Sequence, residues 1–138
     1  MSFESNSKYY DAFASIVKIT LRDGYVAEEE MMFLKHLSVK LQIPAHEYED
    51  VRENYLYKPI QPLITYKERL EALHRLTQII DEDYTIAGDI QNKWVNRMVV
   101  GLGFNPVNAK YIGGKAMDLV KLGVDTKSFV YEIQNLNR

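Results

Sequence analysis

Cysteine is absent from the 138 residues of the sequence. Without thiols the chain has no disulfide, no thiolate ligand for a metal and no cysteine nucleophile. No apolar run approaches the roughly 18 residues of a membrane span, and the opening MSFESNSKYY lacks the basic and apolar regions of an export signal. We therefore expect a cytoplasmic protein that does not insert into a membrane.

An excess of basic residues is also missing. Seventeen Lys and Arg stand against 19 Asp and Glu, which gives a net charge of -2, and the basic residues are spread along the whole chain. Proteins that bind nucleic acid use clustered Lys and Arg to neutralise phosphates. We therefore expect no nucleic-acid partner.

Apolar residues recur at helical spacing and nowhere alternate as in a strand. The spacing predicts an all-α fold of about seven helices, with Thr65, Asn105 and Asp125 as N-caps of the fourth, sixth and last helices. In the fifth helix we expect Ile90, Trp94 and Met98 on the buried face. The expected ranges are about 9–20, 28–42, 44–55, 65–80, 87–102, 106–119 and 126–137.

The sequence repeats itself when it is shifted by 60 positions. The shift places Asp23 on Asp83 and Glu29 on Asp89, so that both turns read Asp-x-x-(Val/Ile)-Ala-x-(Glu/Asp). We therefore predict a single domain, 1–138, built from two three-helix halves, about 6–57 and 65–122, plus the helix 126–137. The halves are expected to be related by a pseudo-twofold axis, and prolines in the segment 55–63 mark the boundary between them.

One further match lies at the end of the second helix of each half. A single inserted residue aligns Leu41-Gln-Ile-Pro44 with Leu102-Gly-Phe-Asn-Pro106. The match extends the repeat, so the two halves look like one three-helix unit written twice.

At these turns the sequence resembles the tellurite-resistance TerB-like domains. The residues that carry the resemblance are Asp23-Gly24 followed by Glu28, Glu29 and Glu30, then Asp83 to Asp89, and the stretch Gly101-Leu-Gly-Phe-Asn-Pro106. It departs from the family pattern at Tyr84, where a glycine is expected, and at Ile90, where an acid often follows. The resemblance implies a bacterial cytoplasmic domain associated with metal-ion or general stress responses, with no settled enzymatic activity and with acidic turns that hold a metal ion.

The acidic turns also point to a cation on chemical grounds. Ca²⁺, Mg²⁺ and Mn²⁺ take several oxygen ligands at once. The two groups that qualify are Asp23 with Glu29 and Glu30, and Asp83 with Asp89, to which Asp81 is a further candidate. The alternative is structural, because acids at the start of a helix also stabilise its dipole and cap its free N–H groups. Both interpretations stay open on the sequence.

Tyrosines around the proline-bearing connector suggest a second kind of binding surface. Tyr55 and Tyr57 lie there, and tyrosine is enriched where proteins bind one another. The alternative function is therefore an ion-independent scaffold that binds a protein partner through the connector. The sequence leaves the oligomeric state and the identity of any partner open.

Two remaining motifs are weaker. Asp81-Glu-Asp83-Tyr-Thr85 matches the Asp-x-Asp-x-Thr nucleophile of a class of phosphatases, but that chemistry needs the motif at the end of a parallel strand, and the segment before it reads as a helix. Gly113-Gly114 lacks the strand and third glycine of a dinucleotide-binding loop, so close helix packing explains it better. We rank the phosphatase third and expect no enzyme.

Overall fold

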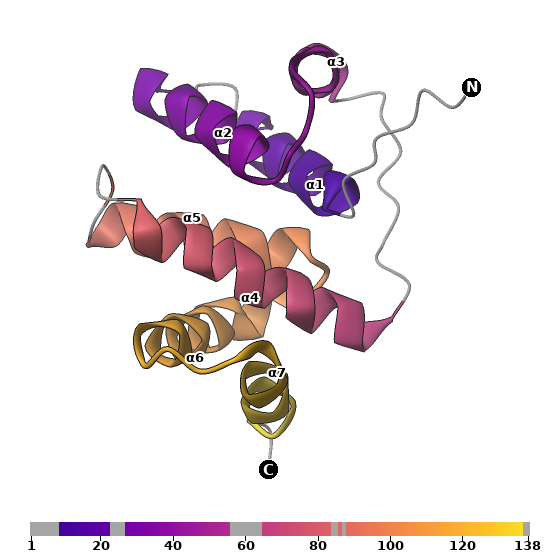
Figure 1. Ribbon diagram of the computed structural model, residues 1–138. Coiled ribbons are helices and arrows are strands. Elements are labelled where there is room, and N and C mark those ends of the chain that lie inside the picture. Colours follow the sequence, from indigo (N-terminus) through magenta and orange to yellow (C-terminus); the bar gives the residue numbers. More distant parts are fainter. Residues whose placement is uncertain (1–8, 23–26, 56–64, 84–85, 87, 137–138) are drawn as a thin grey trace. The chain divides into compact units, whose positions relative to one another are not determined.

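The computed structural model describes residues 9–22, 27–55, 65–83, 86 and 88–136. They form seven α-helices and one short 3₁₀ turn, η1, and they contain no strand (Figure 1). The all-α fold of about seven helices predicted from the apolar spacing is therefore confirmed.

The chain divides into two compact units, Met1–Pro62 and Leu63–Arg138. The division falls inside the connector that the two prolines marked in the sequence, because a helix cannot continue through proline. Residues 56–64 of this connector lie outside the described residues. The pseudo-twofold relation between the halves stays a prediction.

Three helices make up the N-terminal unit: α1 (Tyr10–Leu21), α2 (Glu28–Lys40) and α3 (Ala45–Asn54). The third helix contacts both α1 and α2, and the Phe13 and Tyr48 rings lie 6.0 Å apart between their centroids. The Tyr55 hydroxyl donates a hydrogen bond of 3.3 Å to the Leu21 carbonyl. This bond joins the end of α3 to the end of α1.

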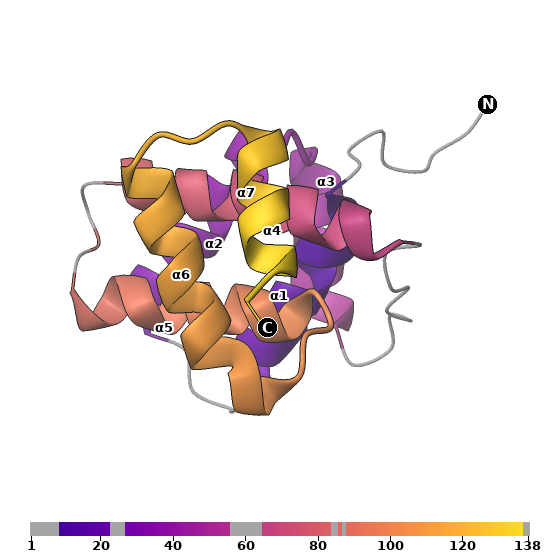
Figure 2. The same cartoon turned by 90° about the horizontal axis from the view of Figure 1, so that it is seen from below.

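The C-terminal unit holds α4 (Tyr66–Glu82), α5 (Asp89–Gly101), η1 (Pro106–Asn108), α6 (Ala109–Lys121) and α7 (Thr126–Gln134). The fourth helix contacts α5, α6 and α7, and α6 and α7 lie side by side against it (Figure 2). Its apolar stripe is fully buried, as the spacing predicts, at Leu70, Leu73, Leu76 and Ile80. Burial of each such side chain contributes about 1.5–3 kcal/mol, so α4 forms the centre of this unit.

The predicted caps are present, and one of them shows where the sequence interpretation was incomplete. The side chains of Thr65 and Asp125 accept hydrogen bonds from the backbone N–H groups of Glu68, at 3.0 Å, and Ser128, at 2.8 Å. Asn105 accepts from the Val107 N–H at 3.0 Å. It caps η1, and α6 begins only at Ala109, because the first turn after the proline is a tighter 3₁₀ turn.

Ile90 is not part of the core. Its side chain is 54% exposed, whereas Trp94 and Met98 on the same helix are buried as predicted. The physical reason is position: Ile90 is the second residue of α5 and precedes the length of the helix that other elements cover. Helical spacing identifies a face but not how far along the helix that face is covered.

The two turns aligned by the repeat have the same local structure. Gln42 and Gly103 both have a positive φ, 61° and 98°. The residue after each donates its N–H back to the preceding helix, Ile43 to the Ser38 carbonyl at 2.9 Å and Phe104 to the Val99 carbonyl at 3.2 Å. This is the hydrogen bond of a Schellman helix end, so the two aligned segments end their helices in the same way.

Candidate functional site

The first acidic turn is described only from Ala27 onward, so Asp23 lies outside the described residues. Glu29 is exposed in the first turn of α2. A carboxylate oxygen of Glu30 accepts the Ala27 backbone N–H at 3.4 Å. The first N–H groups of a helix lack partners inside it, so Glu30 has a structural use at this helix end.

In the second acidic turn, the two predicted ligands have different positions relative to the helices. Asp83 is the C-terminal cap of α4, with its N–H donating to the Ile80 carbonyl at 3.2 Å. Asp89 is the exposed first residue of α5 and follows Gly88, whose φ is 59°. Residues 84, 85 and 87 lie outside the described residues. The aspartates thus belong to opposite ends of two successive helices.

Within the described part of the chain, no group of three or more His, Asp or Glu side chains lies close enough together to hold a metal ion. None of Glu29, Glu30, Asp83 and Asp89 therefore takes part in a three-ligand cluster of described residues. Because Asp23 is not among these residues, a cation site that includes it stays a prediction.

Tyr55 of the connector and Asp81 of the phosphatase-like motif both make contacts within the protein. Tyr55 is half-buried and its hydroxyl is bonded to α1, and Tyr57 lies outside the described residues. Asp81 is in the last turn of α4, where its carboxylate pairs with the Lys121 ammonium at 3.2 Å. It does not lie at the end of a strand, which is the position that phosphoryl-transfer chemistry requires of this motif.

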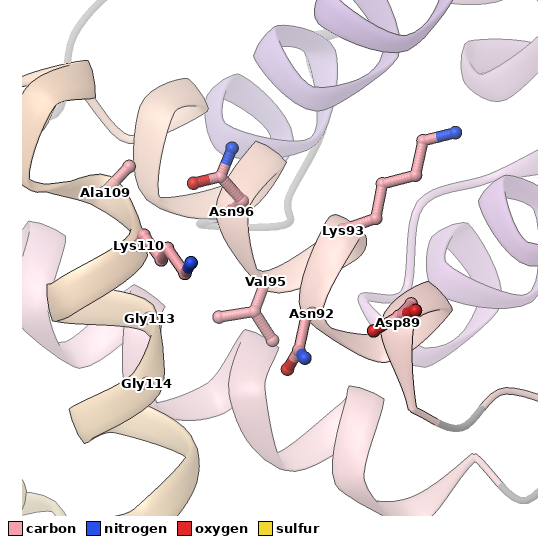
Figure 3. A pocket seen from close by; sticks show the side chains of 9 residues that line it. All are labelled: Asp89, Asn92, Lys93, Val95, Asn96, Ala109, Lys110, Gly113 and Gly114. Carbon is pink, nitrogen blue, oxygen red and sulfur yellow. The ribbon is translucent and has the colours of Figure 1, made fainter.

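A hollow of about 430 Å³ lies between α5 and α6 on the C-terminal unit (Figure 3). Its lining combines small or apolar residues with polar or charged ones. The small or apolar residues are Val95, Ala109, Gly113 and Gly114, and the polar or charged ones are Asp89, Asn92, Lys93, Asn96 and Lys110.

The two helices pack closely beside this hollow. A Cβ atom added at Gly113 would lie 2.8 Å from the Val95 Cγ1 atom, which is closer than real side chains approach. In Figure 3 the Val95 side chain points toward this part of α6. Glycine at 113 thus lets α5 and α6 approach, as expected from the sequence for the Gly-Gly pair.

A second, more open hollow of about 540 Å³ continues along the exposed side of α6. We call its lining the outer face of α6, defined as Val107, Lys110, Tyr111, Gly114, Lys115 and Asp118. The two hollows share Lys110 and Gly114. Val107 is 87% exposed and Tyr111 is 63% exposed, so the face presents apolar and aromatic surface beside its charges.

Sequence reasoning missed this surface. It treated Gly113 and Gly114 as one packing feature, and it found no pattern in lysines that are spread along the chain. The available signal was that two adjacent glycines lie in the middle of a predicted helix, where the close approach of one neighbouring helix explains at most one of them.

A buried histidine of this unit lies elsewhere. His74 on α4 is buried, with its Nδ1 atom 2.9 Å from the Thr126 hydroxyl and its ring against Phe129 at 4.6 Å between centroids. Burial lowers the pKa of His74, and the Val124 carbonyl and the Asp125 carboxylate oppose that effect. The ring joins α4 to the start of α7 and faces neither hollow.

Comparison of this chain with protein-family models, with curated proteins and with solved structures finds no match. None of the described helices has the length and apolar character needed to cross a membrane.

Proposed function

We propose that this chain is a non-enzymatic cytoplasmic module that holds a protein partner on the outer face of α6. The observation that carries the proposal is the meeting of two hollows at Lys110 and Gly114, next to the exposed Val107 and Tyr111 side chains. Exposed apolar groups beside polar rims are typical of protein-binding surfaces. The TerB-like resemblance supports a binding module, because that family has no settled activity.

A photo-cross-linking experiment tests this proposal with a built-in control. Tyr111 on α6 and Tyr131 on α7 are almost equally exposed, 63% and 64%. A photoreactive phenylalanine analogue at 111 is expected to capture a discrete partner in cells of the source organism, whereas the analogue at 131 is not. The capture should be lost in Gly114→Trp, where the new side chain fills the surface.

Equal labelling from the two positions, or capture that survives Gly114→Trp, would remove the outer face as the binding surface. The melting temperature of each variant shows that the protein is still folded. Substitution at Gly114 is suited to this test, because an added Cβ meets no atom within 4 Å.

A divalent cation at the acidic turns is the second candidate function. The favouring observation is that Glu29 and Asp89 are exposed at the starts of α2 and α5 and make no ion pair within the described part of the chain. A cation that binds only the folded state would stabilise it by about 2.7 kcal/mol at a hundred times its Kd. Melting temperature with Ca²⁺, Mg²⁺ or Mn²⁺ measures this.

The double variant Asp23→Asn/Asp83→Asn should abolish the rise in melting temperature, and Glu132→Gln on α7 should keep it. A melting temperature that does not change with any of the three cations would exclude this function while leaving the partner-binding proposal intact.

A further inference from the structure

Gly114 is not required by the packing of α6. A glycine inside a helix lowers its stability relative to alanine, because the unfolded glycine has more conformational freedom to lose. At Gly113 the closeness of Val95 explains the glycine, but an added Cβ at Gly114 would meet no atom within 4 Å. The described structure therefore gives no internal reason for a missing side chain at position 114.

Lys110 is also unfavourable for the helix that carries it. It is the second residue of α6, whose first turn contains no acidic residue, and the N-terminal end of a helix dipole repels positive charge. Within the described part of the chain, neither Lys110 nor the nearby Lys115 forms an ion pair. Lys121, by contrast, is paired with Asp81.

The two residues that are unfavourable for the helix, Lys110 and Gly114, lie close together. Lys110 lies one helical turn before Gly114, and both residues line both hollows. Departures from local preference are expected where a surface serves binding rather than folding. A glycine allows a foreign backbone to approach closely, and two unpaired ammonium groups attract carboxylates.

We infer that the outer face of α6 binds an acidic segment of a partner protein, which passes over Gly114 and places carboxylates beside Lys110 and Lys115. This inference rests on the proposed function and adds the chemistry of the partner. Tyr111 and Val107 supply apolar contact on the same face, since both are largely exposed.

Asp118 gives the bound segment a direction. It lies one turn after Gly114 on the same face, so the face carries Lys110 one turn before the glycine, Lys115 directly after it and a negative charge at its far end. Acidic residues of the segment are therefore favoured at the Lys110 end and disfavoured at the Asp118 end. Asp118→Lys should tighten the binding of an acidic peptide.

The direct test uses the full chain and two short fluorescent peptides of matched length. One peptide contains glutamate, leucine and alanine, and the other has lysine in place of each glutamate. The acidic peptide is expected to bind, with affinity that falls as salt is added, and with backbone amide shifts on α6 in an NMR titration. The lysine peptide should not bind there.

Charge reversal then tests whether Lys110 and Lys115 bind the acidic peptide. Lys110→Glu/Lys115→Glu should weaken binding of the acidic peptide by about tenfold or more, since two attractive surface pairs of roughly 0.2–1 kcal/mol each become repulsive. Lys127→Glu, an equally simple reversal at an exposed position of α7, should have little effect. Gly114→Leu should prevent binding while the melting temperature shows a folded protein.

The outcomes separate the inference from the function on which it rests. If cross-linking at Tyr111 persists in Lys110→Glu/Lys115→Glu and the acidic peptide does not bind, the face holds a partner of different chemistry and the inference is wrong. Concentration-dependent dimerisation that Gly114→Leu abolishes would show a second copy of this chain as the occupant and would also overturn it.

Discussion

Gly113 lies on the buried face of α6 and Gly114, the next residue, on its exposed face. An added methyl group at 113 would lie against Val95, whereas at 114 it would meet open space. The buried face thus contains the residues that packing against α5 and α4 requires. The exposed face contains a glycine that the packing of the helix does not require, and this difference is the reason for proposing a binding surface there.

Valine at position 113 and valine at position 114 should differ most in their effect on the free energy of unfolding. Gly113→Val forces α5 and α6 apart and is expected to lower the free energy of unfolding by about 2–3 kcal/mol, the usual range for an overpacked core. Gly114→Val should stay within about 0.5 kcal/mol of the original, because only helix propensity changes. Chemical denaturation measures both; equal losses would contradict the assignment of the two glycines.

Next in size we expect a pH effect from the buried His74, which contrasts with the exposed lysines of α6. Because burial lowers its pKa, the folded protein binds this proton less tightly than the unfolded chain does. The stability contribution is complete above the unfolded-state pKa of about 6.5 and is lost as pH falls toward the lowered folded pKa.

The melting temperature between about pH 7 and 5 reports this loss, in the range below the unfolded-state histidine pKa. His74→Gln removes the titrating group and should flatten the curve. An unchanged slope in His74→Gln would show that other groups cause the dependence. The lowered pKa of Asp125, caused first by the hydrogen bond from the Ser128 N–H, acts at more acidic pH.

Alanine at position 114 should stabilise the protein, in contrast to valine at position 113. Gly114→Ala is expected to raise the free energy of unfolding by about 0.5–1 kcal/mol, because alanine is the better helix former. It should also weaken binding of the acidic peptide, because the added methyl group lies where the peptide backbone approaches. Denaturation and peptide titration on one sample measure both. A variant that is stabilised and binds unchanged would show that no partner backbone approaches Gly114.

The smallest expected effect is electrostatic. Lys110→Glu places a negative charge near the start of α6 and should stabilise the protein by about 0.3–1 kcal/mol at low ionic strength. The gain should shrink in high salt because the charge is exposed. Lys127→Glu in the first turn of α7 is the comparison for a second helix start, and denaturation at two salt concentrations separates dipole from general charge effects.

Helices and their ends were largely predictable because their causes are local. The caps at Thr65, Asn105 and Asp125 depend on side chains within three residues of the N–H groups that they accept from. Ile90 was predicted wrongly for the converse reason, since its exposure depends on where the covering elements stop. The acidic turns were found by pattern, but the sequence could not tell a capping carboxylate such as Glu30 from an ion ligand.

The sequence by itself determined the all-α class, the positions of the helices and the connector between the two units, because apolar spacing, prolines and caps act over a few residues. Only the tertiary structure decided that Gly113 and Gly114 have different surroundings and that Lys110 meets Gly114 where two hollows join. The difference between the two glycines depends on the approach of α5 to α6. That approach is set by contacts between residues far apart in the chain, which no local pattern records.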